Sequence, residues 1–190
     1  GSIKVDSVDI NTVSRKSLRQ NVGMVLQDTW LKSGTIKENI VFGNENVTDE
    51  QVIEAAKKSH AHSFIKKLHN GYDTFIGEDG GSLSTGQKQL ICITRLMLSP
   101  PPILILDEAT SSVDPENEQQ LITALNNLLK DKTVIVIAHK LETIKNADQI
   151  VVMDKGNIES IGKHKELMEK SNIYKSFIEK REKATGWKIE

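Results

Sequence analysis

Two apolar runs, which flank a stretch with helical character, constrain the fold of this chain more than any other feature of its sequence. They cover residues 103–106 and 133–137, and neither alternates with polar residues as a strand with one solvated face does. Such runs are typical of strands that are buried on both faces of a parallel sheet. Residues 115–130 between them are predicted to form the connecting helix, because parallel strands need a long crossover. We therefore expect an α/β fold built on a parallel sheet.

The composition is that of a globular domain and argues against several other classes. With 37% hydrophobic and 27% charged residues, the 190-residue chain can bury a core and is not expected to be disordered. Its formal net charge of −1, with signs interspersed, gives no basic stripe, so no nucleic-acid partner is expected. The single cysteine, Cys92, excludes an internal disulfide. No apolar run approaches the roughly 20 residues that cross a bilayer, and residues 1–6 do not resemble a signal peptide.

The rest of the chain divides into further predicted strands and helices. Residues 22–27 are expected to form a strand, and Thr48 is expected to cap a helix that runs to Gly71. A second helix is predicted to begin near Ser84 and to end before three consecutive prolines. The C-terminal part is expected to form a hairpin and two short helices, at residues 150–161 with a turn at Gly156 and Asn157, then at 164–170 and 173–183.

Polar side chains follow three of the predicted strands. Asp107 and Glu108 follow the first apolar run, His139 follows the second, and Gln27 ends the strand at 22–27. Phosphate chemistry in α/β folds usually sits at the carboxyl ends of parallel strands, where an aspartate can hold Mg²⁺ and a glutamate can orient or deprotonate water. His139 could contact a phosphate at the same edge if its strand neighbours that of Asp107. Each residue alone also has an ordinary role, as a solvated carboxylate, a structural histidine or a polar strand end.

The start of the second long helix is a candidate anion site. Ser84 and Gly86 lie where unpaired backbone N–H groups and the positive end of the helix dipole favour a phosphate. Ser84 followed by Gln87 three residues later is also an ordinary capping box, which is the commoner arrangement. Nowhere in the chain is there a G-x-x-x-x-G-K-[ST] loop, the usual backbone cradle for the phosphates of ATP.

The order and spacing of these motifs resemble the nucleotide-binding domain of ATP-binding cassette (ABC) transporters over nearly the whole chain. Five segments carry the resemblance: the Q-loop at 25–28, the signature motif at 83–87, the Walker B strand at 103–108, the D-loop at 112–114 and the switch histidine His139. Segments 33–40, 71–78 and 162–167 look most like exporter-type domains, which are fused to transmembrane helices. The resemblance implies a P-loop NTPase-like sheet core with a helical insert.

This resemblance implies a role for each motif in a pair of domains that clamp two ATP molecules head to tail. Asp107 and Gln27 would bind Mg²⁺, Glu108 would polarise the attacking water and His139 would hold the γ-phosphate. Three further functions fall to other residues: binding of the partner's ATP to Leu83, Ser84, Thr85, Gly86 and Gln87, communication across the dimer to Ser112 and Asp114, and contact with the transmembrane partner to Glu78. Gln27 would also link the metal to the transmembrane contact. Thr85 departs from the usual glycine, and its Cβ is expected to weaken the phosphate platform.

The resemblance also implies an organisation in which the Walker A region is missing at the front. Residues 1–27 would be a remnant of the catalytic subdomain, residues 28–99 the helical subdomain, and residues 100–190 the rest of the catalytic subdomain. The domain would sit peripherally at the cytoplasmic face of the cell membrane, and this chain would be inactive alone. The alternative is a non-catalytic fragment that offers its signature face to an intact subunit. A chromosome-maintenance or repair ATPase is disfavoured, because the insert shows no sustained heptads.

Overall fold

A computed structural model describes residues 1–26, 29–44, 46–107, 115–137 and 141–186. The chain divides into two compact units, residues 1–137 and 138–190, which are described separately below. Within the described ranges, no helix combines the length and the apolar character needed to cross a membrane.

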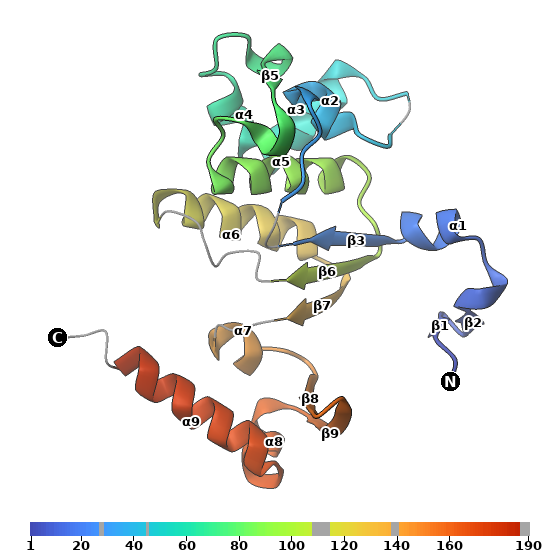
Figure 1. Ribbon diagram of the computed structural model, residues 1–190, viewed down its shortest axis with the longest axis vertical. Coiled ribbons are helices and arrows are strands. Elements are labelled where there is room, and N and C mark those ends of the chain that lie inside the picture. The colour runs from blue at the N-terminus through green and yellow to red at the C-terminus, as the bar shows by residue number, and fades with distance from the viewer. Residues whose placement is uncertain (27–28, 45, 108–114, 138–140, 187–190) are drawn as a thin grey trace. The chain divides into compact units, whose positions relative to one another are not determined.

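The first unit is built on a parallel sheet whose strands come from distant parts of the sequence (Figure 1). In the described part of the chain the strand order is β3 (Val22–Val25), β6 (Ile103–Asp107) and β7 (Thr133–Ile137). Both pairings are parallel, and α6 (Pro115–Leu129) connects β6 to β7. The predicted α/β class, the two apolar strands and the helix between them are thus confirmed.

Helices α5 (Thr85–Leu98) and α6 cover one face of this sheet (Figure 1). Leu104 and Leu106 point to that face and are buried, whereas Ile135 and Ile137 of β7 remain 53% and 52% exposed. The prediction that both runs are buried on both faces is therefore wrong. The reason is positional: among the described elements of the first unit, helices cover one face of β6, and β7 is an edge strand of the described sheet.

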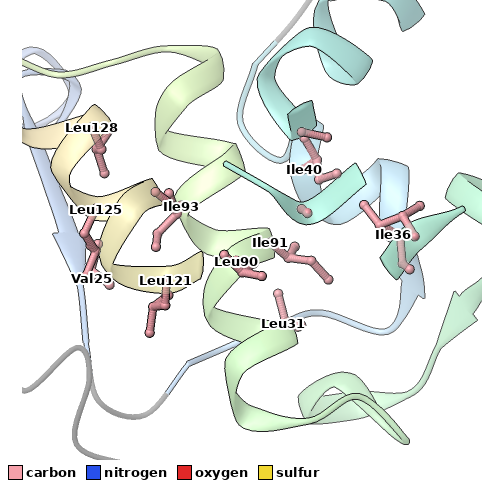
Figure 2. Close-up of a cluster of buried hydrophobic side chains, with 14 of the residues drawn as sticks. Val25, Leu31, Ile36, Ile40, Leu90, Ile91, Ile93, Leu121, Leu125 and Leu128 are labelled. Carbon is pink, nitrogen blue, oxygen red and sulfur yellow. The ribbon is translucent and has the colours of Figure 1, made fainter. Parts of the chain in front are cut away.

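A helical layer packs on α5 and shares a single apolar core with the sheet (Figure 2). It consists of α2 (Ile36–Val41), α3 (Asp49–Lys58) and α4 (Ala61–Ile65). Figure 2 shows side chains of α5 reaching both ways, with Ile93 near the α6 residues and Ile91 toward Ile36. Two more short strands, β4 (Gly34–Thr35) and β5 (Phe75–Ile76), pair antiparallel beside this layer. Helix α5 is therefore the element that joins the sheet to the helical layer.

The helix predicted from Thr48 to Gly71 is in fact two helices. Thr48 caps α3 in a capping box with Gln51, as expected. However, α3 ends at Lys58, and His60 takes a left-handed conformation with φ of 64° before α4 begins. The turn between them is fixed by Ser59, whose buried hydroxyl lies 2.6 Å from that of Thr94 and donates to the carbonyl of Ala56. A tertiary hydrogen bond thus ends a helix that the periodicity alone would continue.

The N-terminal residues form small elements of their own. Strands β1 (Lys4–Val5) and β2 (Val8–Asp9) make a hairpin, and α1 (Arg15–Gln20) follows with Ser14 as its N-cap. Three one-turn 3₁₀ helices complete the described part of this unit, η1 (Ile10–Thr12), η2 (Gly71–Asp73) and η3 (Glu78–Gly80).

The second unit is a hairpin covered by helices. Strands β8 (Ile150–Asp154) and β9 (Asn157–Gly162) pair antiparallel, and Val152 is buried against residues of α8 (His164–Lys170) and α9 (Asn172–Gly186). The hairpin and both helices were predicted, whereas α7 (Leu141–Lys145) was not. The turn consists of Lys155 and Gly156, both with positive φ, and so lies one residue earlier than predicted.

Candidate functional site

The carboxyl ends of the three parallel strands meet at one edge of the sheet. Val25, the last residue of β3, lies opposite Leu106, and Asp107, the last residue of β6, lies opposite Ile137 at the end of β7. The strand that precedes His139 is therefore a direct neighbour of the strand that carries Asp107, as the prediction required. Five predicted site residues follow these ends but lie outside the described residues: Gln27, Glu108, Ser112, Asp114 and His139.

Asp107 places a half-buried carboxylate at this edge. The predicted donors here are the carboxylate of Asp107 and the side-chain amide of Gln27, which both offer oxygen to a cation. Oxygen donors suit Mg²⁺ and not the softer metals that prefer thiolate or imidazole. Within the described ranges, no three His, Cys, Asp or Glu side chains gather into a metal cluster. The chemistry of the donor set therefore fits the cation that nucleotide phosphates usually carry.

The first turn of α5 brings Ser84 and Gln87 together. The Ser84 hydroxyl oxygen accepts a hydrogen bond from the backbone N–H of Gln87 at 3.3 Å, and the Gln87 side-chain oxygen accepts one from the Ser84 N–H at 3.1 Å. This is the capping box that local sequence favoured. The hydroxyl hydrogen of Ser84 is left available, because the oxygen acts only as acceptor in the box. The cap and an anion site are therefore compatible at the same residue.

The neighbouring signature residues differ in exposure. Leu83 is 7% exposed and Gly86 is buried, whereas Thr85 faces solvent. The backbone N–H groups of Thr85 and Gly86 belong to the first turn, which has no intrahelical acceptors. The start of α5 thus combines backbone donors, a free hydroxyl hydrogen and a positive helix end, which is the equipment for binding an anion.

A tight turn leads into this helix. Gly80 is buried with φ of 82°, and a Cβ there would lie 2.9 Å from Cε of Lys88 and 3.1 Å from Cδ1 of Leu31. Only glycine fits this turn without displacing its neighbours. Glu78, at the start of η3, is exposed and so remains accessible to a partner.

Asn39 is a structural residue that sequence reasoning missed. Its side chain is fully buried, accepts from the Lys32 N–H at 2.9 Å, and donates to the carbonyls of Lys32 and Thr35 at 2.9 and 3.0 Å. The Nε–H of Arg95 on α5 donates to the Asn39 carbonyl at 2.8 Å. Asn39 thus ties the segment after β3 to α2 and, through Arg95, to α5. A polar residue on the apolar face of 36–40 was the available signal.

An exposed aromatic pair lies beside this junction. The rings of Trp30 and Phe42 meet edge to face with centroids 5.6 Å apart, and they remain 56% and 44% exposed. The Arg95 guanidinium and the Lys32 ammonium lie over the Phe42 ring, at 5.1 and 5.8 Å from its centroid. Burial lowers the pKa of the Arg95 guanidinium. An exposed aromatic patch of this kind, flanked by cations, is typical of a surface that contacts another protein.

Comparisons with known proteins agree with this geometry. The ABC transporter family model matches residues 1–111. A fatty acid ABC transporter ATP-binding/permease protein of Mycobacterium tuberculosis (strain CDC 1551 / Oshkosh) is 49% identical over 174 residues, which are 92% of this chain and 28% of that protein. The ATP-dependent lipid A-core flippase of Desulfotalea psychrophila (strain LSv54 / DSM 12343) is also 49% identical over 174 residues, 92% of this chain and 30% of that protein.

A solved structure shows the same fold. It is a bacterial Atm1-family ABC exporter with ATP bound, 38% identical in sequence, with a TM-score of 0.84 over 95% of this chain and 32% of that one. The chain spans less than a third of the length of each of these proteins. Both the family match and the structural similarity cover more than half of this chain. The chain therefore belongs to the ABC transporter family, as a nucleotide-binding domain of the exporter type.

Proposed function

We propose that this chain belongs to the ATP-hydrolysing machinery of an ABC exporter and energises transport through nucleotide-driven dimerisation. The main support is the sheet edge where three parallel strands end side by side at Val25, Asp107 and Ile137. Bound Mg·ATP supplies the phosphoanhydride bond and the metal charge that the reaction needs. The chain supplies the groups that position and deprotonate water.

The residues at the sheet edge divide this work. Asp107 and Gln27 hold the metal through oxygen atoms, and Gln27 links it to the transmembrane partner. Glu108 accepts the proton of the attacking water, because it follows the metal ligand directly in sequence. His139 donates a hydrogen bond to the γ-phosphate, which stabilises the charge that develops there. Two of these assignments rest on register, since Asp107 and the strand before His139 are neighbours.

The start of α5 serves the ATP of a second nucleotide-binding domain. The backbone N–H groups of Thr85 and Gly86 and the hydroxyl hydrogen of Ser84 contact its phosphates, while Gln87 holds the turn through the capping box. Thr85 weakens this contact relative to glycine but keeps the backbone donor. Leu83 anchors the motif in the core, and Ser112 and Asp114 carry communication across the dimer.

The partners are a second nucleotide-binding domain and the transmembrane domains of the exporter. Glu78 and the aromatic pair of Trp30 and Phe42 are exposed and suit contact with the transmembrane partner. The domain lies at the cytoplasmic face of the membrane, with residues 28–99 as its helical subdomain between the two catalytic segments, 1–27 and 100–190.

The absence of a P-loop motif from the sequence sets an expectation for the isolated chain. That loop and its lysine cradle the β- and γ-phosphates in P-loop enzymes, and nothing in this sequence matches it. We expect the 190-residue chain to hydrolyse ATP poorly or not at all by itself. The alternative function, a non-catalytic fragment that lends its signature face to an intact subunit, draws support from the fully formed first turn of α5.

Calorimetry and ATP turnover, measured for the chain alone and with an intact exporter nucleotide-binding domain, test the proposal. Variants Glu108→Gln and Gly86→Glu probe the two halves, and Glu50→Gln, an exposed residue of α3, is the matched control. Turnover in the mixture that is lost in Glu108→Gln supports a catalytic role. Turnover that is sensitive to Gly86→Glu alone supports the non-catalytic alternative.

Two other results would count against these statements. Turnover by the chain alone at ordinary enzyme rates, abolished by Glu108→Gln, would refute the expected inactivity. No binding and no turnover in the mixture beyond those of the intact domain alone, with the control variant folded, would overturn the proposed function.

A further inference from the structure

A separate pocket lies in the helical layer of the first unit. It has a volume of about 240 Å³ and is lined by residues of α2, α3 and η2: Lys37, Asp49, Val52, Ile53, Tyr72 and Asp73. None of these residues has a role in the nucleotide site proposed above. The pocket is therefore a candidate for a separate binding site.

The floor of the pocket is apolar and uncharged. Val52 is 2% exposed, and Ile53 beside it is half-buried. The Tyr72 hydroxyl is already engaged with Nδ1 of His62 at 2.8 Å, and burial raises the pKa of Tyr72 to about 12. The tyrosine thus stays a neutral phenol at physiological pH and offers the pocket its ring. A ligand with an aliphatic stem would find three apolar surfaces here.

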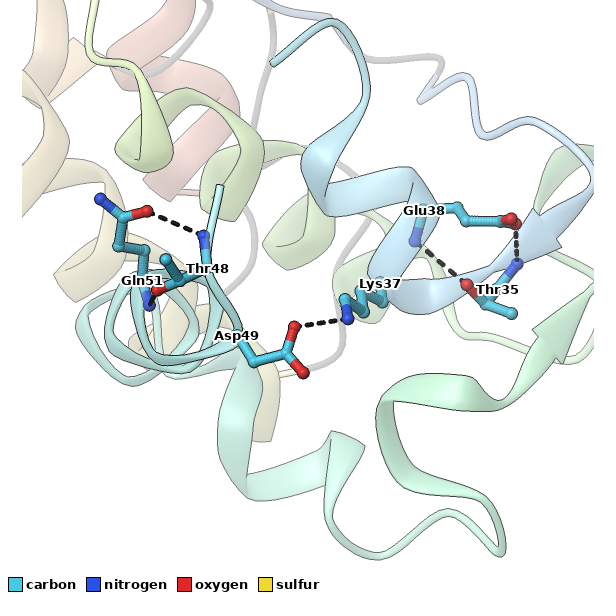
Figure 3. Close-up of polar contacts among 6 residues, drawn as sticks. All are labelled: Thr35, Lys37, Glu38, Thr48, Asp49 and Gln51. Atoms are coloured by element: carbon cyan, nitrogen blue, oxygen red, sulfur yellow. Dashed lines mark hydrogen bonds and ion pairs between the residues drawn. The ribbon is translucent and has the colours of Figure 1, made fainter. Parts of the chain in front are cut away.

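The rim carries one cation and two carboxylates. Lys37 on α2 forms an ion pair with Asp49 at the start of α3 (Figure 3). The hydrogen bond to Asp49 raises the pKa of Lys37 against the opposing effect of burial, and the charge of Asp73 adds to it. Asp73 itself forms no ion pair with any residue that the structure describes. The single ammonium is therefore paired with one of the two carboxylates, and the rim keeps a net negative charge.

We propose that this pocket binds an organic cation, a guanidinium or ammonium group on a short aliphatic stem. The cationic head pairs with Asp73 and reaches toward Asp49, while the stem lies on Val52, Ile53 and the Tyr72 ring. A guanidinium suits the rim better than an ammonium, because its planar fork can meet two carboxylates at once.

Other ligand classes fit the pocket less well. An anion would face Asp49 and Asp73, and a divalent metal ion would face the Lys37 ammonium with only two carboxylates to hold it. An uncharged apolar ligand would desolvate the carboxylate of Asp73 without providing a compensating hydrogen bond or charge. The organic cation satisfies both the floor and the rim.

The proposal is tested by NMR titration of the full 190-residue chain with n-butylguanidinium, and with n-butanol and butyrate as matched probes. We expect saturable shifts of the Val52 and Ile53 methyl groups with the guanidinium alone. Asp73→Asn should weaken binding about threefold to fivefold, as expected for a partly exposed ion pair. Lys37→Met should strengthen it, because the competing ammonium is removed. Glu50→Gln, an exposed residue of α3 outside the pocket, should leave the affinity unchanged.

A second arm separates two sources of the same chemistry. Acetyl-Gly-Arg-Gly-amide presents the guanidinium as a protein side chain would, and tighter binding of the peptide points to a partner protein. Tighter binding of n-butylguanidinium points to a free small molecule. Absence of saturable shifts below about 10 mM, or equal shifts with butyrate, overturns the proposal. Binding that is unchanged in both Asp73→Asn and Lys37→Met also overturns the proposal. The same spectra show whether the two variants are folded.

Discussion

Ser84 and Gln87 bind each other reciprocally across the first turn of α5, through hydrogen bonds of 3.3 and 3.1 Å between each side chain and the other's backbone N–H. The signature residues thus have a structural task in addition to the proposed contact with ATP. Any variant of Ser84 changes both tasks at once, so a loss of activity alone does not identify a ligand contact.

The structural task predicts a stability change. Ser84→Ala should lower the free energy of unfolding by about 1 kcal/mol, because the N-cap acceptor is lost. Gln87→Glu should keep the stability nearly unchanged, because glutamate also closes a capping box. Urea unfolding followed by circular dichroism measures both. Equal stability of Ser84→Ala and the parent chain would contradict the cap.

The left-handed turn at His60 predicts a stabilising substitution. His60 has φ of 64°, is exposed, and makes no side-chain cap to α4. His60→Gly should raise the free energy of unfolding by up to about 1 kcal/mol, since glycine adopts this conformation without a steric cost. His60→Ala removes the same ring but keeps Cβ, and should change little. The urea midpoints of the two variants decide the matter, and a shift of equal size in both would exclude relief of strain.

The exposed apolar side chains of β7 predict self-association of the isolated chain. Ile135 and Ile137 are about half exposed on a strand that pairs on one side only among the described strands. Exposed apolar edge strands are templates for pairing between molecules. Ile135→Lys should therefore reduce association measured by light scattering over a concentration series. Ile122→Lys on α6, at a residue 42% exposed, is the control and should have a smaller effect.

The surroundings of His62 predict a pH dependence of the stability. Burial lowers the pKa of His62 below its ordinary value of 6.5, and the positive charges of Lys66 and Lys57 lower it further. The folded state thus binds fewer protons than the unfolded state just below pH 6.5, so this part of the stability is present above pH 6.5 and is lost as the pH falls through the lowered pKa. His62→Gln should reduce the difference in urea midpoint between pH 7.5 and pH 5.5.

A matched variant isolates this histidine. His69→Gln, at an exposed histidine in the same region, serves as the control for the substitution itself. Carboxylates with lowered pKa values, such as Glu54 and Glu159, act at lower pH, near or below 4.5. An unchanged slope in His62→Gln between pH 7.5 and pH 5.5 would sink the assignment.

Local sequence patterns predicted most elements of the fold, because caps and periodicity act over a few residues. Ser84 and Thr48 each cap a helix where the sequence predicted its start. The break at Ser59 escaped prediction because it depends on Thr94, a residue of another helix. The exposure of β7 was not predicted, because an apolar run shows that a strand can be buried but not which elements cover it.

The candidate site was predictable to a different degree. Two apolar runs joined by a helix predicted two parallel strands, but the sequence left open whether the strand before His139 lies next to that of Asp107, and the structure pairs them directly. The junction between Asn39 and Arg95 could not be predicted, because the hydrogen bond that forms it joins residues that are 56 positions apart. The roles of Gln27, Glu108, Ser112, Asp114 and His139 remain predictions, since these residues lie outside the described ranges.

The hydrogen bond between Arg95 and Asn39 couples movement of α2 to a tilt of α5. Arg95 lies 11 residues beyond Ser84, so about 16 Å of stiff helix separates the residue held by α2 from the turn proposed to touch a nucleotide. A tilt of about 10° about the Arg95 end would carry the Ser84 end through about 3 Å, which is the length of one hydrogen bond. A displacement of the segment that Asn39 binds, next to Trp30, would therefore make or break the proposed contact between Ser84 and the nucleotide.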